Sequence, residues 1–463
     1  MIMHPFLVRH VLLPLHERLK RTPTFPWLAR LERTQWLPRE ELLELQFARL
    51  REHVQFAYDH TVYYRRLLDD HELPPHRIQS PADFARIPPL TRELLRQNFA
   101  DLQARGARLG RVQPLATGGS TGQPVTVLVD VSVGIDLASR HRAHRWFGAE
   151  PGAREIVLWG SPIELGRQSR VRSLRDWLLN SRLLSAFDLG EPALARYTAE
   201  IERYQPEIMY GYASAFYVLA RYLQRVGWRR RFPLKAIFTT AEPLLDFQRL
   251  AIESVFECPV GVEYGARDAG SLADECPQRG LHIEAESVLL ETEGRTPDGL
   301  GEILVTNLYS PAMPLIRYRT GDMGELDEGA CRCGRSLPLL KRVEGRRTDF
   351  LVTPSGRVLH ALGIIYVLRE VATLKEFQVI QEAVDRVRVD LVPEPAFSGQ
   401  DREGIVRRVH TLMGTDVDVQ VNLVDSIQRA ASGKFRYVIS HVADAHLDAI
   451  LAGETCAAAR RAG

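Results

Sequence analysis

The chain has 463 residues, 45% of them hydrophobic and 25% charged, which is enough for two or three domains with substantial cores. Its 60 basic and 58 acidic residues leave a formal net charge of +2, so no excess of positive charge favours a nucleic-acid partner. Five cysteines exclude a disulfide-rich secreted scaffold, and no apolar run approaches the roughly 20 residues that span a bilayer. We therefore expect a cytoplasmic enzyme without an integral membrane segment.

The first 110 residues are predicted to be largely helical. Residues 1–20 are apolar but are interrupted by Arg9 and several histidines, and no small-residue cleavage site follows. This pattern suits an amphipathic helix better than a signal peptide. Apolar residues at helical spacing predict a helix from Arg39 to Leu68, which Pro38 would start. After a proline-rich stretch, one more helix is predicted near Arg92 to Arg105.

From about residue 115, apolar β-rich runs alternate with amphipathic helical runs. This alternation predicts a layered α/β domain on a largely parallel sheet. A β-rich subdomain follows, over residues 281–290 and 302–307. We place the large N-terminal domain at residues 1–345. Its predicted strands cover residues 125–129, 156–159, 208–212, 236–240 and 260–264, and its predicted helices cover residues 193–204, 215–226 and 245–256.

A small α+β domain is predicted over residues 346–463. The short basic stretch 341–347 marks the boundary. Beyond it the pattern alternates between strand-like and helical segments, which predicts a compact second unit. The predicted strands cover residues 378–380, 387–392 and 417–424, and the predicted helix covers residues 402–413.

A glycine-rich segment, Thr-Gly-Gly-Ser-Thr-Gly-Gln-Pro over residues 117–124, leads directly into the first strand of the α/β region. Its glycines let the backbone approach an anion, and its hydroxyl groups can donate hydrogen bonds to phosphate oxygens. The spacing is not that of a P-loop, and the segment contains no lysine. By itself it is equally compatible with a flexible turn.

Five further segments change this interpretation, because with the glycine-rich loop they form an ordered set. In order and spacing, the set resembles the core motifs of adenylate-forming enzymes: acyl-CoA synthetases, peptide-synthetase adenylation domains and luciferases. The resemblance is greatest to the phenylacetate-CoA ligase-like branch, particularly its CapK-type proteins, and covers nearly the whole chain. The segments are Ala241-Glu242-Pro243, Glu263-Tyr264-Gly265-Ala266-Arg267-Asp268, Tyr318-Arg319-Thr320-Gly321-Asp322, Gly345-Arg346-Arg347-Thr348-Asp349 and Ala431-Ser432-Gly433-Lys434-Phe435-Arg436.

The resemblance implies that a carboxylate attacks the α-phosphate of ATP, which releases pyrophosphate and leaves an acyl-adenylate. Two anions must meet, so the site needs positive charge, hydrogen-bond donors and Mg²⁺. The loop would hold the β- and γ-phosphates, although Gln123 stands where the family usually has a lysine. The loop residues implied in phosphate binding are Thr117, Gly118, Gly119, Ser120, Thr121 and Gly122.

The other motifs imply individual roles. Lys434 would be the catalytic lysine that bridges the carboxylate and the α-phosphate, and the small domain that carries it would rotate between two half-reactions. Asp268 would ligate Mg²⁺, Asp322 would accept hydrogen bonds from the ribose hydroxyls, and Arg346 would contact the ribose or phosphate. Tyr264 would pack against adenine, and Glu242 and Pro243 would line the adenine side. Ala241, Glu263 and Gly265 complete the residues implied in ATP binding.

The acyl pocket is the least specific prediction. By resemblance, Tyr210, Tyr212 and Ser214 would border it, with Trp159 and Phe238 as neighbours. An aromatic lining would accept an aryl or other apolar acid. The same residues are equally typical of a buried sheet core.

A second chemistry is indicated by Cys276, His282, Cys331 and Cys333, which form a Cys-x5-His and a Cys-x-Cys pair. Three thiolates and an imidazole suit a closed tetrahedral Zn²⁺ site, and some phenylacetate-CoA ligase-like proteins carry structural zinc of this kind. The alternative is a set of unpaired thiols beside an ordinary strand histidine.

We predict an ATP-dependent ligase that transfers its acyl group to a thiol, with coenzyme A as the expected acceptor. One alternative is transfer to an amine or hydroxyl, giving an amide or ester in a polysaccharide or natural-product pathway. Another is a non-catalytic nucleotide-binding scaffold. Only Gln123 and Asp268, which depart from the residues usual in the family, favour it. A carboxylic acid and the acyl acceptor are the expected partners, and a homodimer is compatible with the sequence.

Overall fold

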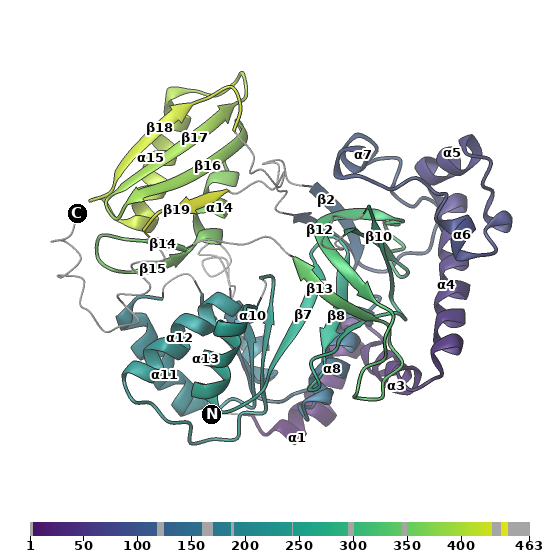
Figure 1. Cartoon of the computed structure of the whole chain (residues 1–463), viewed down its shortest axis with the longest axis horizontal. Helices are drawn as coiled ribbons and strands as arrows, with labels where there is room; N and C mark the ends of the chain where they lie inside the picture. Colours follow the sequence, from purple (N-terminus) through teal and green to yellow (C-terminus); the bar gives the residue numbers. More distant parts are fainter. Residues whose placement is uncertain are drawn as a thin grey trace.

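The computed structural model describes residues 3–117, 125–159, 170–186, 189–242, 244–294, 301–344, 350–427 and 437–442. Within this part of the chain, no helix is both long and apolar enough to cross a lipid bilayer. The predicted fold class is confirmed: an α/β part built on a large mixed sheet with helices is followed by a smaller α+β unit (Figure 1).

The first hundred residues are helical, as predicted. The predicted helix over residues 39–68 is broken at Thr61, whose extended backbone ends α4 and whose side chain caps α5 by accepting a hydrogen bond from the Tyr64 amide. The predicted helix that starts at Arg92 ends at Gln97, because Asn98 leaves helical geometry. The helical elements are α1 (Pro5–Leu7), the π-helical turn η1 (Val8–Leu12), α2 (Leu13–Lys20), α3 (Thr24–Thr34), α4 (Arg39–His60), α5 (Val62–Asp70), the 3-10 turn η2 (Pro75–Arg77), α6 (Pro81–Phe84) and α7 (Arg92–Gln97).

The large sheet has eleven strands, in the order β10-β11-β12-β13-β9-β8-β7-β6-β5-β3-β4. One half of it, from β4 to β7, is parallel, as predicted for the α/β region. Beyond β7 every pairing is antiparallel, and most of these strands lie in or after the predicted β-rich subdomain. The strands are β3 (Glu155–Trp159), β4 (Ser181–Ser185), β5 (Ile208–Gly211), β6 (Ala236–Thr240), β7 (Val260–Ala266), β8 (Gly270–Glu275), β9 (Leu281–Ile283), β10 (Val288–Glu293), β11 (Gly301–Asn307), β12 (Tyr318–Asp327) and β13 (Leu339–Glu344).

Helices cover the parallel half of the sheet, and α11, α12 and α13 lie side by side over it (Figure 1). Their apolar residues join those of the strands in one buried cluster that includes Ile201, Phe216 and Phe256. The helices of this region are α8 (Ile135–Trp146), α10 (Arg170–Leu178), α11 (Glu191–Tyr204), α12 (Ala213–Arg225) and α13 (Asp246–Phe256).

The strand predicted at residues 125–129 does not join the large sheet. It is β2 (Val125–Asp130), which pairs antiparallel with β1 (Val112–Thr117) in a separate two-stranded sheet. Thr117 lies opposite Val125, so the glycine-rich segment connects two paired strands. The prediction missed β1, the partner that keeps β2 out of the large sheet.

The C-terminal part has its own four-stranded sheet, in the order β18-β17-β16-β19, with its own buried apolar cluster (Figure 1). The predicted strands and the predicted helix of this part are all present. Its elements are β14 (Phe350–Val352), β15 (Val358–His360), α14 (Ala361–Arg369), β16 (Leu374–Ala383), β17 (Arg386–Pro393), α15 (Gly399–Met413), β18 (Asp418–Leu423) and β19 (Val438–Ser440).

Candidate functional site

The ends of three parallel strands meet at one edge of the large sheet. β5, β6 and β7 are adjacent, with Gly211 opposite Thr239 and Thr240 opposite Glu263. The segments at these ends therefore lie side by side, at the edge of a parallel sheet where ligands usually bind. The predicted site residues on them are Tyr210, Tyr212, Ser214, Ala241, Glu242, Glu263, Tyr264 and Gly265.

Glu242 connects two of these segments. Its Oε2 accepts a hydrogen bond from the Ser214 backbone N–H at 3.0 Å, in the first turn of α12. A carboxylate there satisfies a free N–H group and opposes the positive end of the helix dipole. Ala241, with a left-handed backbone at φ 66°, turns the chain out of β6 just before it.

Two tyrosines hold the two predicted acids. The Tyr264 hydroxyl donates to Asp322 Oδ2 at 3.1 Å, and the Tyr318 hydroxyl donates to Asp268 Oδ2 at 2.6 Å. Burial raises the pKa of Tyr264 well above its ordinary value, and the charge of Asp322 raises it further. The phenol therefore stays protonated and remains a hydrogen-bond donor at neutral pH.

The contact between Tyr264 and Asp322 requires the antiparallel half of the sheet to curl. Tyr264 is on β7 and Asp322 is on β12, and three strands lie between β7 and β12 in the sheet order. In a flat sheet the two strands would be about 19 Å apart. The curl brings the Tyr318–Asp322 motif back to the strand ends of the parallel half.

Arg92 fixes the start of β12 and was not predicted as a site residue. Its Nε donates to the Tyr318 hydroxyl at 3.4 Å, and its Nη2 donates to the Thr320 carbonyl. Leu90 forms a parallel bridge with Tyr318 beside it. In the sequence, Arg92 was marked only as the start of a predicted helix after a proline-rich stretch.

Glu263 faces an internal polar cluster. Its Oε1 lies 2.7 Å from His144 Nε2 and 3.9 Å from Arg140 Nε. Burial alone would raise the pKa of Glu263, but the hydrogen bond and charge of His144 and the charge of Arg140 hold it below its ordinary value. Asp274 lies opposite Glu263 on β8, and burial together with the charges of Glu284 and Glu263 raises its pKa well above its ordinary value.

The predicted acyl-pocket residues form an aromatic stack. The Trp159 and Tyr212 rings lie 4.2 Å apart, and the Arg140 guanidinium carbon lies 3.8 Å from the Tyr210 ring centroid. Tyr212 and Ser214 are buried, as is Phe238, whose ring stacks on His144. Tyr212 also belongs to the buried apolar cluster of this half of the sheet, and Trp159 packs against that cluster.

Several predicted residues lie outside the described part of the chain. Thr117 ends β1, but the rest of the phosphate-binding segment follows it. The roles proposed for these residues stay predictions. They are Gly118, Gly119, Ser120, Thr121, Gly122, Gln123, Pro243, Arg346 and Lys434.

The four predicted metal ligands do come together. Cys276 Sγ lies 3.6 Å from Cys331 Sγ, Cys333 Sγ lies 3.2 Å from His282 Nε2, and all four ligand atoms lie within 4.8 Å of one another. Cys276 follows β8, His282 is in β9, and the other two cysteines lie between β12 and β13. The antiparallel pairing of β8, β9 and β13 therefore assembles the cluster.

This geometry fits Zn²⁺. Zinc–sulfur and zinc–nitrogen bonds in a tetrahedron put neighbouring ligand atoms about 3.3 to 3.8 Å apart. His282 presents Nε2 to the cluster while its Nδ1 lies 3.4 Å from the Leu337 carbonyl, which orients the ring. Cβ on Gly280 would lie 2.5 Å from Cys331 Sγ, so only glycine leaves room for the cluster.

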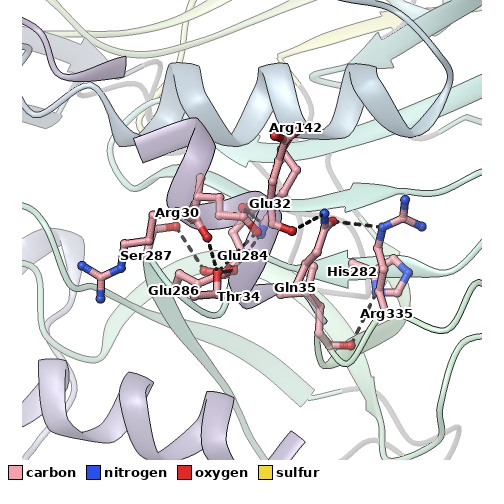
Figure 2. A network of polar contacts seen from close by, with 12 residues as sticks. Arg30, Glu32, Thr34, Gln35, Arg142, His282, Glu284, Glu286, Ser287 and Arg335 are labelled. Carbon is pink, nitrogen blue, oxygen red and sulfur yellow. Dashed lines mark hydrogen bonds and ion pairs between the residues drawn. The ribbon is translucent and has the colours of Figure 1, made fainter. Parts of the chain in front are cut away.

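A polar network joins the cluster to the N-terminal helices (Figure 2). Gln35, just after α3, accepts hydrogen bonds from Arg335 at 3.1 Å and from the Trp146 indole at 2.8 Å. The fully buried Arg142 pairs with Glu284 and with Glu286 Oε1 at 2.7 Å. These contacts tie α3 and α8 to the loops that carry the cluster.

Comparison with known proteins gives a consistent result. A family model described as the CapK C-terminal domain matches residues 351–441. Protein CapK of Staphylococcus aureus is 25% identical over 419 residues, which cover 87% of this chain and 90% of that protein. A phenylacetate-coenzyme A ligase of Thermus thermophilus is 26% identical over 444 residues, which cover 87% of this chain and 97% of that protein.

Solved structures share the fold. A 2-hydroxyisobutyryl-CoA ligase, solved with 2-HIB-AMP and CoA in its thioesterification state, has a TM-score of 0.61 at 20% identity. The match covers 91% of this chain and 94% of that one. An open conformation of the same ligase has a TM-score of 0.56 at 21% identity, with 88% of this chain and 93% of that one covered.

Proposed function

We propose that this chain is a CapK-type member of the phenylacetate-CoA ligase-like, adenylate-forming enzymes, and that it activates a carboxylic acid with ATP and passes the acyl group to coenzyme A. The observation that carries the proposal is the pair of tyrosine–acid contacts, Tyr264 with Asp322 and Tyr318 with Asp268. They bring two separate motifs to the strand ends where a nucleotide would bind.

In the proposed complex, adenine packs beside Tyr264, and the ribose hydroxyls donate to Asp322. The Tyr264 hydroxyl already occupies one lone pair of Asp322 Oδ2, which fixes the orientation of the carboxylate. A carboxylate has about four lone-pair sites, so enough remain for both ribose hydroxyls. The Glu242 side chain holds the start of α12 and so shapes the adenine side.

Asp268 is proposed as the ligand of Mg²⁺, which would neutralise charge on the phosphates of bound ATP. Tyr318 holds one carboxylate oxygen, and Arg92 supports Tyr318 from behind. The carboxylate is thereby aimed before the nucleotide arrives. Such preorganisation is how a site stabilises charge without rearrangement.

Adenylation would be completed by Lys434, with the phosphates held by residues 117–122. We propose that residues 1–345 and 346–463 form separate domains and that the smaller one brings Lys434 to the site. Three thiolates and His282 would hold a structural Zn²⁺ at the cluster of Cys276, Cys331 and Cys333. The aromatic stack of Trp159 and Tyr212 favours an aryl or other apolar acid.

The first test is carboxylate-dependent ATP–pyrophosphate exchange, with Mg²⁺ and without coenzyme A, across aryl, short-chain, medium-chain and amino acids. Exchange with one class identifies the acid; no exchange while ATP still binds would contradict the proposed activity and support a scaffold. Coenzyme A is then added to the active acid. Thioester formation supports a thiol acceptor, whereas AMP release only with an added amine or alcohol would replace coenzyme A by that acceptor.

A further inference from the structure

A helical segment near the N-terminus presents an apolar stripe to solvent. From α1 through η1 to α2, large apolar side chains recur every four residues and remain exposed. Leu19 is 77% exposed, Leu15 51% and Val11 49%, and Phe6 and Leu7 continue the stripe toward residue 4. These five residues are referred to below as the bare stripe.

The opposite side of the same segment is fixed to the body of the protein. Val8 is fully buried, and Cβ on Gly152 would lie only 3.0 Å from Val8 Cγ1. Glu17 is also buried; its carboxylate lies 3.0 Å from His16 Nδ1 and accepts hydrogen bonds from the Thr22 and Thr24 hydroxyls. The segment is therefore a helix packed against the rest of the protein on one side and exposed to solvent on the other.

The π-helical turn has an identifiable cause. Pro14 has no backbone N–H and would clash with the carbonyl four residues earlier in a regular α-helix. The Leu13 amide instead bonds to the Val8 carbonyl, five residues back. An α-helix rotates residues four apart by about 40° per step, and the wider turn reduces that drift, which keeps the stripe on one side.

Among residues 3–31, which carry the bare stripe, basic residues outnumber acidic ones. Glu17 is the only acidic residue among residues 3–31, and its side chain points into the protein. Arg9 pairs with Glu150 at 3.1 Å, whereas Arg18, Lys20 and Arg21 have no ion pair within the described residues. Although the whole chain is nearly neutral, this surface offers free positive charge beside apolar side chains.

A neighbouring helix extends the same surface. The charges of Arg175 and Asp176 on α10 and of Arg111 act on Lys20, so these residues lie near the end of α2. Arg175 is itself paired with Asp176 at 2.5 Å. Leu174 on α10 is 56% exposed. α10 therefore adds an exposed apolar residue near the basic end of α2.

We propose that the bare stripe and its flanking basic residues dock this enzyme onto the surface of an anionic lipid bilayer. The helical segment would lie in the plane of the interface, with its apolar side chains among the acyl chains and Arg18, Lys20 and Arg21 at the headgroups. A second copy of the chain is disfavoured as the occupant, because symmetric pairing would bring these unpaired cations together. An in-plane helix needs no membrane-spanning length.

The test uses the full chain in co-sedimentation with vesicles of phosphatidylcholine alone or with about 30 mol% phosphatidylglycerol. We expect binding to the anionic vesicles only, with a loss of at least about tenfold in the presence of about 0.5 M NaCl. The variant Leu15→Glu/Leu19→Glu should bind at least about tenfold more weakly, because two charges would enter the acyl region. Leu423→Glu, at a residue 54% exposed on the C-terminal sheet, is the matched control and should bind like the natural chain.

Two results would overturn the proposal. One is absence of binding of the natural chain to anionic vesicles; the other is equal binding by Leu15→Glu/Leu19→Glu and the natural chain. If neither protein binds vesicles, and the natural chain is a dimer while Leu15→Glu/Leu19→Glu is a monomer, the stripe is instead the contact surface for a second copy of the chain. Circular dichroism and thermal melting of each variant distinguish lost docking from lost folding.

Discussion

Hydroxyl groups from two strands hold the two acids of the candidate site. Tyr264, Asp268 and Asp322 could be predicted because each belongs to a short motif that is contiguous in sequence. The contact of Tyr318 with Asp268 joins residues 50 positions apart, and that of Arg92 with the Thr320 carbonyl spans 228 positions. Local sequence patterns carry no information about such distant pairs. The residues that hold each acid could therefore be identified only from the structure.

Tyr264→Phe tests whether the hydroxyl positions Asp322. The ring and its packing remain, but Asp322 loses one hydrogen bond to a charged group, worth about 1.5 to 3 kcal/mol. We expect KM for ATP in pyrophosphate exchange to rise at least about tenfold, with little change in KM for the acid. Asp322→Asn should raise KM for ATP as well, and the double variant should lose less than the sum of the two. Strict additivity would contradict a positioning role.

Asp274→Asn tests the buried acids behind the site. The raised pKa of Asp274 means that the unfolded chain ionises this group before the folded chain does. Stability therefore falls as pH rises above the ordinary carboxyl pKa toward the raised one. Asparagine does not titrate, so the variant should gain apparent Tm over the natural chain as pH rises from about 5 to about 8. Asp385→Asn, at an exposed turn, should show no such gain; an equal gain in both would contradict the prediction.

At the scale of elements, the cluster of Cys276, His282, Cys331 and Cys333 joins the loop between β12 and β13 to β8 and β9. Spacing and ligand chemistry predicted the four residues, and the structure confirms that they meet. The arrangement of strands was less predictable. β2 and the antiparallel half of the large sheet had the composition of strands, but composition does not say which strands pair or which sheet they join. β2 pairs with β1, which was not predicted, and β9 pairs with the much later β13, which only packing sets.

Removal of the metal should destabilise the protein more than it impairs adenylation. We expect about one zinc ion per chain by elemental analysis, and a lower apparent Tm after chelation or in Cys331→Ser. ATP–pyrophosphate exchange below the melting transition should persist, because the cluster lies away from Tyr264 and Asp322. Cys258→Ala, at a buried thiol outside the cluster, should keep its zinc. The zinc site would be refuted if the natural chain contained no zinc and its apparent Tm did not change with chelator.

At the scale of the whole molecule, the proposed division of labour between the two parts can be tested through Lys434. Lys434→Ala should reduce adenylation at least about 100-fold, since one charge-stabilising group is removed from the transition state. Acyl transfer from a supplied acyl-adenylate to coenzyme A should be largely spared. Lys375→Ala, on β16 of the same part, is the control and should leave both steps intact. Equal loss of both half-reactions in Lys434→Ala would refute the division.

The N-terminal helices are buried by strands that come much later in the chain. The Tyr64 hydroxyl accepts from the Ile316 amide, 252 residues away, and Gln46 donates to the Val288 carbonyl, 242 residues away. At ribosomal rates, roughly 13 to 50 s pass between synthesis of Tyr64 and of its partner. During that interval the apolar faces of α4 and α5 have no native cover. The nascent chain is therefore a natural client for chaperones that bind at the ribosome, and its yield should depend on them more than its final stability does.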